Sequence, residues 1–229
     1  MLRRACLAAA LTVSACSQPP PATPVDAPPE IIKIDRGPTS MESEIGGMNE
    51  EAVGHAFDAL QTEVAACIRE GSERVREIGG RFVLSLRIDR QGALRWAYLS
   101  ESTIGDRETE KCVLGLARVR TWPKPVGGEG LATRAFEIDA GTEPLTLEPK
   151  RVRGAVRAAA DKLGRCKRGH GGSFVATAYV RPDGRVFAAG VAPPSEEGEE
   201  AADCIAETIE KLRFRSPGRR AAKVTFEVP

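Results

Sequence analysis

The chain has 229 residues with 33 lysines and arginines against 32 aspartates and glutamates, a formal charge of +1. So small a net charge argues against nucleic acid as a partner, because such binding draws its affinity from cationic side chains on phosphates. The balance is uneven along the chain. Residues 150–229 hold 16 basic against 10 acidic side chains, and residues 49–149 hold 13 against 17.

Residues 1–15 are typical of an export signal that takes no part in the fold. Arg3 and Arg4 precede the apolar stretch Ala5–Val13, which is shorter than the roughly 20 residues that span a bilayer. The following Val-Ser-Ala-Cys resembles the bacterial lipobox, which implies cleavage before Cys16 and lipidation of its thiol. Ser17 then favours the outer membrane by resemblance to bacterial sorting patterns. The alternative is an ordinary signal peptide cut near Ala15.

Residues 16–48 are expected to form a tether. Seven prolines between Pro19 and Pro38 favour extended conformations and prevent a packed core. Within this segment Glu30-Ile31-Ile32-Lys33-Ile34 is apolar and strand-like. We expect it to dock on the following domain as an edge strand; the alternative is a short linear motif for a partner.

Residues 49–140 predict a small domain of order α-β-β-α-β. Asn49 is a suitable N-cap, and apolar residues at a 3–4 spacing continue until Gly71, where the helix is expected to end. Alternation then predicts strands over 82–88 and 94–100, joined by a turn at Asp89–Gly92. Asp106 is expected to cap a second helix whose core-facing residues are Cys112, Val113, Leu116 and Val119. A third strand is expected over Leu131–Ile138.

Residues 141–149 read as a linker, and residues 150–229 repeat the same order. A helix is expected to end at Gly164, strands over 174–180 and 186–191 flank a turn at Gly184, Ser195 opens a helix, and 224–228 closes the sheet. The repeat is visible in the spacing, since Cys112 follows Gly92 by twenty residues and Cys204 follows Gly184 by twenty.

The predicted fold class is therefore α+β: two tandem α-β-β-α-β domains, each a three-stranded antiparallel sheet covered on one face by two helices. Leu84, Leu86 and Trp96 correspond to Ala176, Ala178 and Ala188 in the second copy. The second core is thus thinner, and we expect that domain to be the less stable or to rest on its neighbour.

Four cysteines remain after Cys6 and Cys16, two in each copy. An exported protein permits disulfides, and of the three pairings the repeat selects Cys67–Cys112 and Cys166–Cys204. Each bridge is expected to join buried helix faces and to contribute about 3–4 kcal/mol. No Cys-x-x-Cys occurs, and His55 and His170 stand at non-equivalent positions, so neither redox chemistry nor a zinc site is expected.

These residues resemble the TonB carboxy-terminal-like domain, closest to the AgmX/PglI-type module of myxobacterial envelope and gliding proteins. The resemblance depends on the following residues: Cys67, Phe82–Asp89 with Gly92, Ser102-Thr103, Cys112, Trp122-Pro123-Lys124-Pro125, Gly127-Gly128 and the strand at Phe136. It covers residues 49–140 and, more weakly, 150–229. It implies a periplasmic interaction domain without catalytic residues, whose sheet edge accepts an extended peptide.

Two candidate binding features follow. The third strand, with Leu131 and Phe136, is the sheet edge that the resemblance implies. Separately, a basic cluster containing Arg213, Arg215, Arg219 and Arg220 is a candidate patch for peptidoglycan carboxylates or lipid phosphates; the alternative is an ordinary solvated surface.

The sequence thus predicts a non-enzymatic outer-membrane lipoprotein, facing the periplasm, that binds an envelope protein or polymer and needs no cofactor or metal. Membrane attachment is through the lipid on Cys16, and oligomeric state is left open. One alternative is a purely structural lipoprotein without an exchangeable ligand, for which mutual burial of the third-strand edges would argue. Another is a component of a TonB-type or gliding-type transport machinery.

Overall fold

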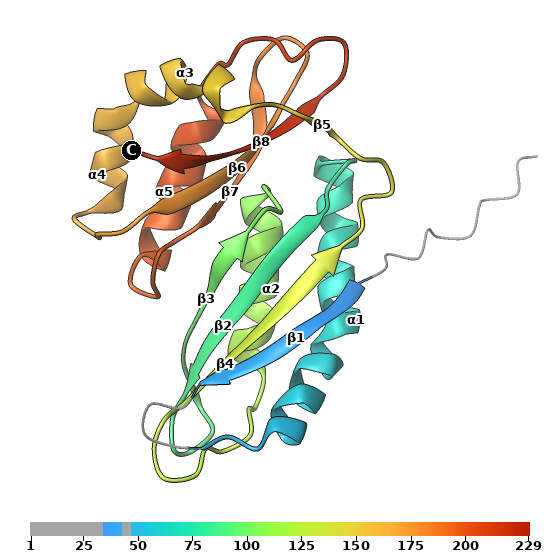
Figure 1. Cartoon of the computed structure of the whole chain (residues 1–229), viewed down its shortest axis with the longest axis vertical. Helices are drawn as coiled ribbons and strands as arrows, with labels where there is room; N and C mark the ends of the chain where they lie inside the picture. Colours follow the sequence, from blue (N-terminus) through green and yellow to red (C-terminus); the bar gives the residue numbers. More distant parts are fainter. Residues whose placement is uncertain (1–33, 43–46) are drawn as a thin grey trace, which may run out of the picture. The chain divides into compact units, whose positions relative to one another are not determined.

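The computed structural model describes residues 34–42, as backbone only, and residues 47–229. The signal segment, Cys16 and most of the tether lie outside these ranges. The described residues form a mixed α+β structure with five α-helices and two sheets (Figure 1). We call residues 34–140 the N-terminal half and residues 141–229 the C-terminal half.

The N-terminal half has one antiparallel sheet of strand order β1-β4-β2-β3. Its elements are β1 (Ile34–Glu42), α1 (Glu50–Arg74), β2 (Gly80–Ile88), β3 (Leu94–Ser102), α2 (Arg107–Val119) and β4 (Gly130–Ile138). The predicted α-β-β-α-β order is present, and β1 adds a fourth strand along β4.

The C-terminal half has a mixed sheet of strand order β5-β8-β6-β7, in which β5 runs parallel to β8. Its elements are β5 (Leu145–Thr146), the 3-10 helix η1 (Pro149–Arg151), α3 (Arg153–Ala158), α4 (Ala160–Lys167), β6 (Phe174–Val180), β7 (Val186–Ala192), α5 (Glu199–Glu210) and β8 (Ala222–Val228). The expected linker therefore supplies a short edge strand.

Several local signals position these elements as predicted. Asn49 caps α1 by accepting from the Ala52 N–H at 2.8 Å, and the Asp106 side chain caps α2. Gly92 and Gly184 both adopt φ of +86° in the turns that connect the first two strands of each half. This conformation favours glycine because it has no Cβ.

Other predicted boundaries were wrong. Gly71 does not end α1, which continues to Arg74; instead Gly71 is buried where α1 approaches α2. Val119 is 85% exposed, because α2 turns its other face to the sheet. The helix expected to end at Gly164 is broken at Ala159 into α3 and α4, and α5 begins at Glu199 rather than near Ser195.

The structure contains both predicted disulfides. Cys67–Cys112 joins α1 to α2 and Cys166–Cys204 joins α4 to α5, with Cα–Cα distances of 5.8 and 5.4 Å. The expectation that all four cysteines lie on buried helix faces was wrong for Cys204, which is exposed. The reason is that Ile205 and Ile209 direct α5 to the sheet, so this bridge joins the buried face of α4 to an exposed position on α5.

Each half has its own apolar core, but the two are not independent, since the described residues 34–42 and 47–229 belong to one compact unit. Tyr179 and Ala188 from the C-terminal sheet are buried in the core of the N-terminal half. The Tyr179 hydroxyl donates to the Glu77 carbonyl at 3.2 Å. The thinner second half therefore rests on its neighbour, which was one of the two outcomes expected.

A buried polar cluster at the start of α2 joins the halves. The Glu110 carboxylate accepts from the Ser102 hydroxyl at 2.6 Å and from the Val191 N–H of β7 at 3.0 Å. Arg107 reaches Glu199 at 2.6 Å and Asp203 at 2.7 Å, both on the C-terminal half. Burial raises the pKa of Glu110 to about 7, although Ser102 and Arg107 oppose the shift.

Substitution Gly71→Ala tests the close approach of α1 to α2. The added Cβ would clash with Thr109 Oγ1 and lie 2.8 Å from Ile78 Cδ1, so we expect a loss of about 1–3 kcal/mol in unfolding free energy. Gly115→Ala is the matched control: it is also helical, has no atom within 4 Å of its Cβ, and should gain about 0.5–1 kcal/mol. Urea denaturation measures both; equal effects would contradict the packing described for Gly71.

The pKa of Glu110 predicts a pH dependence of stability. An acid whose pKa is higher folded than unfolded binds its proton more tightly in the folded state, so unfolding free energy should rise as pH falls from about 7 towards 4.5. The contribution is on the order of 1–3 kcal/mol. Glu110→Gln should flatten this dependence when denaturation is followed between pH 5 and 7.5. Burial lowers the pKa of Lys223 to about 8, so Lys223 changes the unfolding free energy mainly above pH 7.5. An unchanged slope in Glu110→Gln would refute the assignment.

Candidate functional site

The outer edges of the two equivalent third strands, β4 and β8, differ. In the N-terminal half β1 pairs antiparallel along β4, from Ile34 opposite Ile138 to Glu42 opposite Leu131. In the C-terminal half β5 pairs only with Ala222 and Lys223 of β8. The remaining stretch 224–228 has no strand partner on this side among the described residues.

The backbone of this stretch directs hydrogen-bonding groups outwards. The Lys223 carbonyl accepts from the Leu147 N–H at 2.8 Å, so Lys223 presents its main-chain groups to the outer side. Because these groups alternate between the two sides of a strand, Thr225 and Glu227 present theirs to the same side. The edge thus has donors and acceptors placed for another strand.

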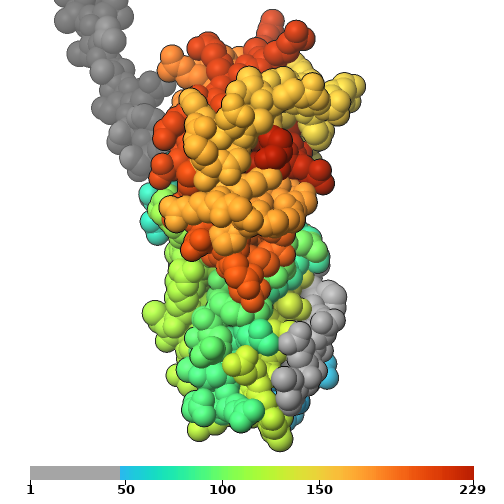
Figure 2. Space-filling model, turned by 90° about the vertical axis from the view of Figure 1, so that its left-hand side faces the viewer, coloured from blue at the N-terminus to red at the C-terminus, as the bar shows by residue number. Residues whose placement is uncertain are grey.

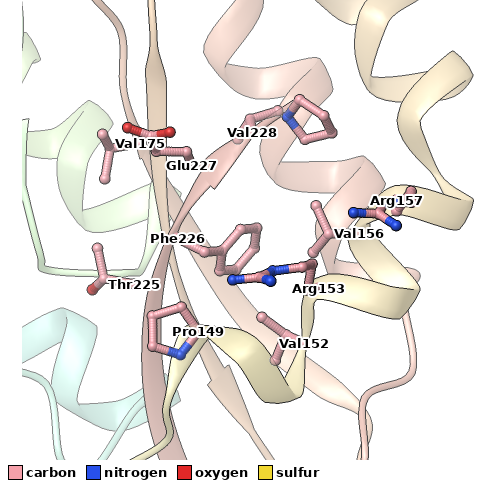
Figure 3. Close-up of a pocket in the computed structure, with 11 residues that line it drawn as sticks. Pro149, Val152, Arg153, Val156, Arg157, Val175, Thr225, Phe226, Glu227 and Val228 are labelled. Atoms are coloured by element: carbon pink, nitrogen blue, oxygen red, sulfur yellow. The ribbon is translucent and has the colours of Figure 1, made fainter.

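A cavity of about 610 Å³ opens beside this edge, between β8 and the α3 segment (Figure 3). We call it the β8 groove. It is lined by Pro149, Val152, Arg153, Val156, Arg157, Val175, Thr225, Phe226, Glu227, Val228 and Pro229. Figure 2 shows the dark red end of the chain at the surface, bordered by the yellow segment that contains α3.

The groove follows from one difference between the repeats. Val156 precedes the helix cysteine of its half by ten residues, as Phe57 does in the N-terminal half. Phe57 is fully buried and makes an edge-to-face contact with Trp122, with ring centroids 5.1 Å apart. Valine is smaller and leaves the corresponding space beside Phe226 unfilled.

The charges at this position also differ between the halves. Asp58, next to Phe57, forms an ion pair with Arg134 of β4 at 2.9 Å. The corresponding residues are Arg157 and Val224, so in the C-terminal half the carboxylate is replaced by a guanidinium and its partner is lost. Arg153 and Arg157 both line the groove, both are exposed, and neither forms an ion pair within the described residues.

The predicted open edge at Leu131 and Phe136 was wrong. Phe136 is 3% exposed and stacks on Phe82 at 4.8 Å between ring centroids, so its side chain belongs to the core. Leu131 is half-buried, and β1 covers the outer edge of β4 (Figure 1). Of the apolar segment expected to dock as an edge strand, the structure describes only Ile34, which begins β1 and lies opposite Ile138, while residues 30–33 lie outside the described residues.

The four predicted arginines between α5 and β8 are all exposed, and two of them donate to carbonyl groups of other segments. Arg213 donates to the Asp183 carbonyl at 3.1 Å, and Arg220 donates to the Glu143 carbonyl at 3.5 Å. Arg215 and Arg219 are exposed on the same segment, and none of the four lines the β8 groove.

The described residues contain no group of three His, Cys, Asp or Glu side chains placed to hold a metal ion. His170 contacts Glu200 at 2.8 Å, and His55 lies 3.7 Å from Glu51 on α1. Within the same part of the chain, no helix combines the length and apolarity needed to cross a membrane.

Comparison of the chain with protein-family models, curated proteins and solved structures found no match. The groove residues Val152, Val156, Arg157 and Glu227 were not predicted to bind a partner. A signal was present, since aligning the repeats on their cysteines places Val156 opposite Phe57 and Arg157 opposite Asp58.

Proposed function

We propose that the chain is a non-enzymatic, lipid-anchored envelope protein that binds an extended segment of a partner protein by strand addition at β8. In this proposal Cys16 carries the lipid, and the anchor places the protein on the outer membrane, facing the periplasm. One observation carries the binding function: the outer edge of β8 lies open beside a groove, whereas the equivalent edge of β4 is covered by β1.

The pairing of β1 with β4 supports this mode of binding. It shows that a third strand of this architecture accepts an additional strand on its outer side. The Phe-Glu-aliphatic stretch that pairs with Ile34–Arg36 recurs as Phe226–Val228 in β8. A partner strand there would gain main-chain hydrogen bonds, and the groove would select its side chains.

The resemblance to TonB carboxy-terminal-like domains agrees with strand addition, although a lipid anchor cannot relay energy from an inner-membrane complex. We therefore propose binding without energy transduction, in place of a transport-machinery role. A polymer partner has less support, because none of the four exposed arginines after α5 lines the β8 groove.

A purely structural role is the second candidate. The observations in its favour are the closure of β4 by the chain's own β1 and the buried contact between the halves. These observations account for β4 and β7 but leave the edge at 224–228 unexplained.

Photo-crosslinking in the protein's own cells tests the proposed function. A photoreactive residue at Arg153, on the rim of the groove, should capture a discrete partner, whereas one at exposed Arg165 on α4 should not. Adding Glu227→Pro should reduce capture about tenfold, because proline removes an outward N–H and blocks the approaching strand.

Glu227 is exposed at the edge of the sheet, so the proline variant should retain both disulfides and its circular dichroism spectrum. Absence of any captured protein, or capture that survives the proline, would favour the structural role.

A further inference from the structure

We infer that the segment bound in the β8 groove carries an apolar side chain and, two residues along, an acidic side chain. This inference rests on the strand-addition function proposed above and identifies the chemistry of the partner. It follows from the charge and the shape of the groove beside α3.

The charge argument begins with Arg153 and Arg157, which lie one helical turn apart and both line the groove. Figure 3 shows the Arg153 side chain extending towards Phe226, and Arg157 farther from β8, beyond Val156. No carboxylate among the described residues forms an ion pair with either guanidinium. The acid that lines the groove is Glu227, which lies on β8. Guanidinium groups favour carboxylates because the planar fork donates two parallel hydrogen bonds.

The shape argument concerns the wall of the groove. Val152, Val156, Phe226 and Val228 make it apolar, and they are among the buried residues of the second core. Val156 of this wall corresponds in the repeat to the larger Phe57, so a large apolar side chain from a partner would supply the volume that the N-terminal half has at this position. The volume of the cavity is within the roughly 300–1,000 Å³ of ligand sites.

A single strand meets both requirements. Alternate residues of a strand point to the same face, about 6.8 Å apart, so residues i and i+2 would both face α3. Arg153 and Arg157 are separated by a helical rise of about 6 Å, which is close to this repeat. An apolar residue followed by acids at alternate positions therefore matches the wall and both arginines.

Two peptides test this inference on the full-length protein in detergent. The first is acetyl-Thr-Phe-Thr-Asp-Thr-Asp-Thr-amide with a fluorescent label, and the second has Asn in place of both Asp residues. Fluorescence anisotropy should show the acidic peptide binding about fivefold more tightly at low salt. The difference should shrink as salt is added, because exposed charges are screened.

Substitutions test whether Arg153 and Arg157 cause the preference for the acidic peptide. Arg153→Glu combined with Arg157→Glu should remove the preference for the acidic peptide, while Arg165→Glu, an exposed arginine on α4 outside the groove, should preserve it. Val156→Phe introduces the residue of the N-terminal half and should weaken both peptides by filling the groove. Intact disulfides and an unchanged melting temperature would show that each variant is folded.

The outcomes separate this inference from the proposed function. Equal binding of both peptides, abolished by Glu227→Pro, would overturn the acidic chemistry and leave strand addition standing. Binding of neither peptide, or binding that Glu227→Pro and Val156→Phe do not alter, would overturn both.

Discussion

The outer edge of a third strand carries main-chain N–H and C=O groups that need hydrogen-bond partners, and the two halves of this chain meet that need differently. In the N-terminal half β1 supplies partners along β4. In the C-terminal half β5 supplies hydrogen-bond partners at two residues of β8, and the rest of the described β8 edge has no strand partner and lies beside a groove. An unpaired edge is a site where another strand adds readily, so its position decides what the molecule is able to bind.

The contact between the halves closes another edge and makes the C-terminal half dependent on its neighbour. The Val191 N–H on the outer side of β7 is bound by the Glu110 carboxylate. Tyr179 fills part of the neighbouring core, which compensates for the alanines in its own sheet. This arrangement fixes β7 against the N-terminal half and leaves α3 and the end of β8 outside the contact. Two basic residues of the C-terminal half, Arg153 and Arg157, line the groove on this outer side.

Sequence reasoning succeeded where the determinant is local. Asn49 and Asp106 are side chains that satisfy nearby helix N–H groups, and the turn glycines need a conformation that other residues disfavour. The disulfides followed from a repeated spacing. Sequence reasoning failed where the structure depends on a contact between distant residues. Gly71 was expected to end α1, but it allows α2 to approach the helix closely. The strand Leu131–Ile138 was expected to have an open edge, because its partner β1 lies about a hundred residues earlier in the chain. The groove is recorded in the sequence only as the difference between Phe57 and Val156.

The path of the connection explains why the linker does not close β8 as β1 closes β4. β1 precedes α1 by several residues and lies antiparallel along the whole of β4. The segment before α3 must instead run from the end of β4 to the start of α3 within residues 139–152. It reaches β8 in parallel, pairs at Leu145 and Thr146, and leaves the edge at Pro149, which begins η1 and has no N–H to donate. Because the linker leaves the sheet at Pro149 and enters η1, it provides no strand opposite 224–228. A strand that completes this sheet there must come from another segment.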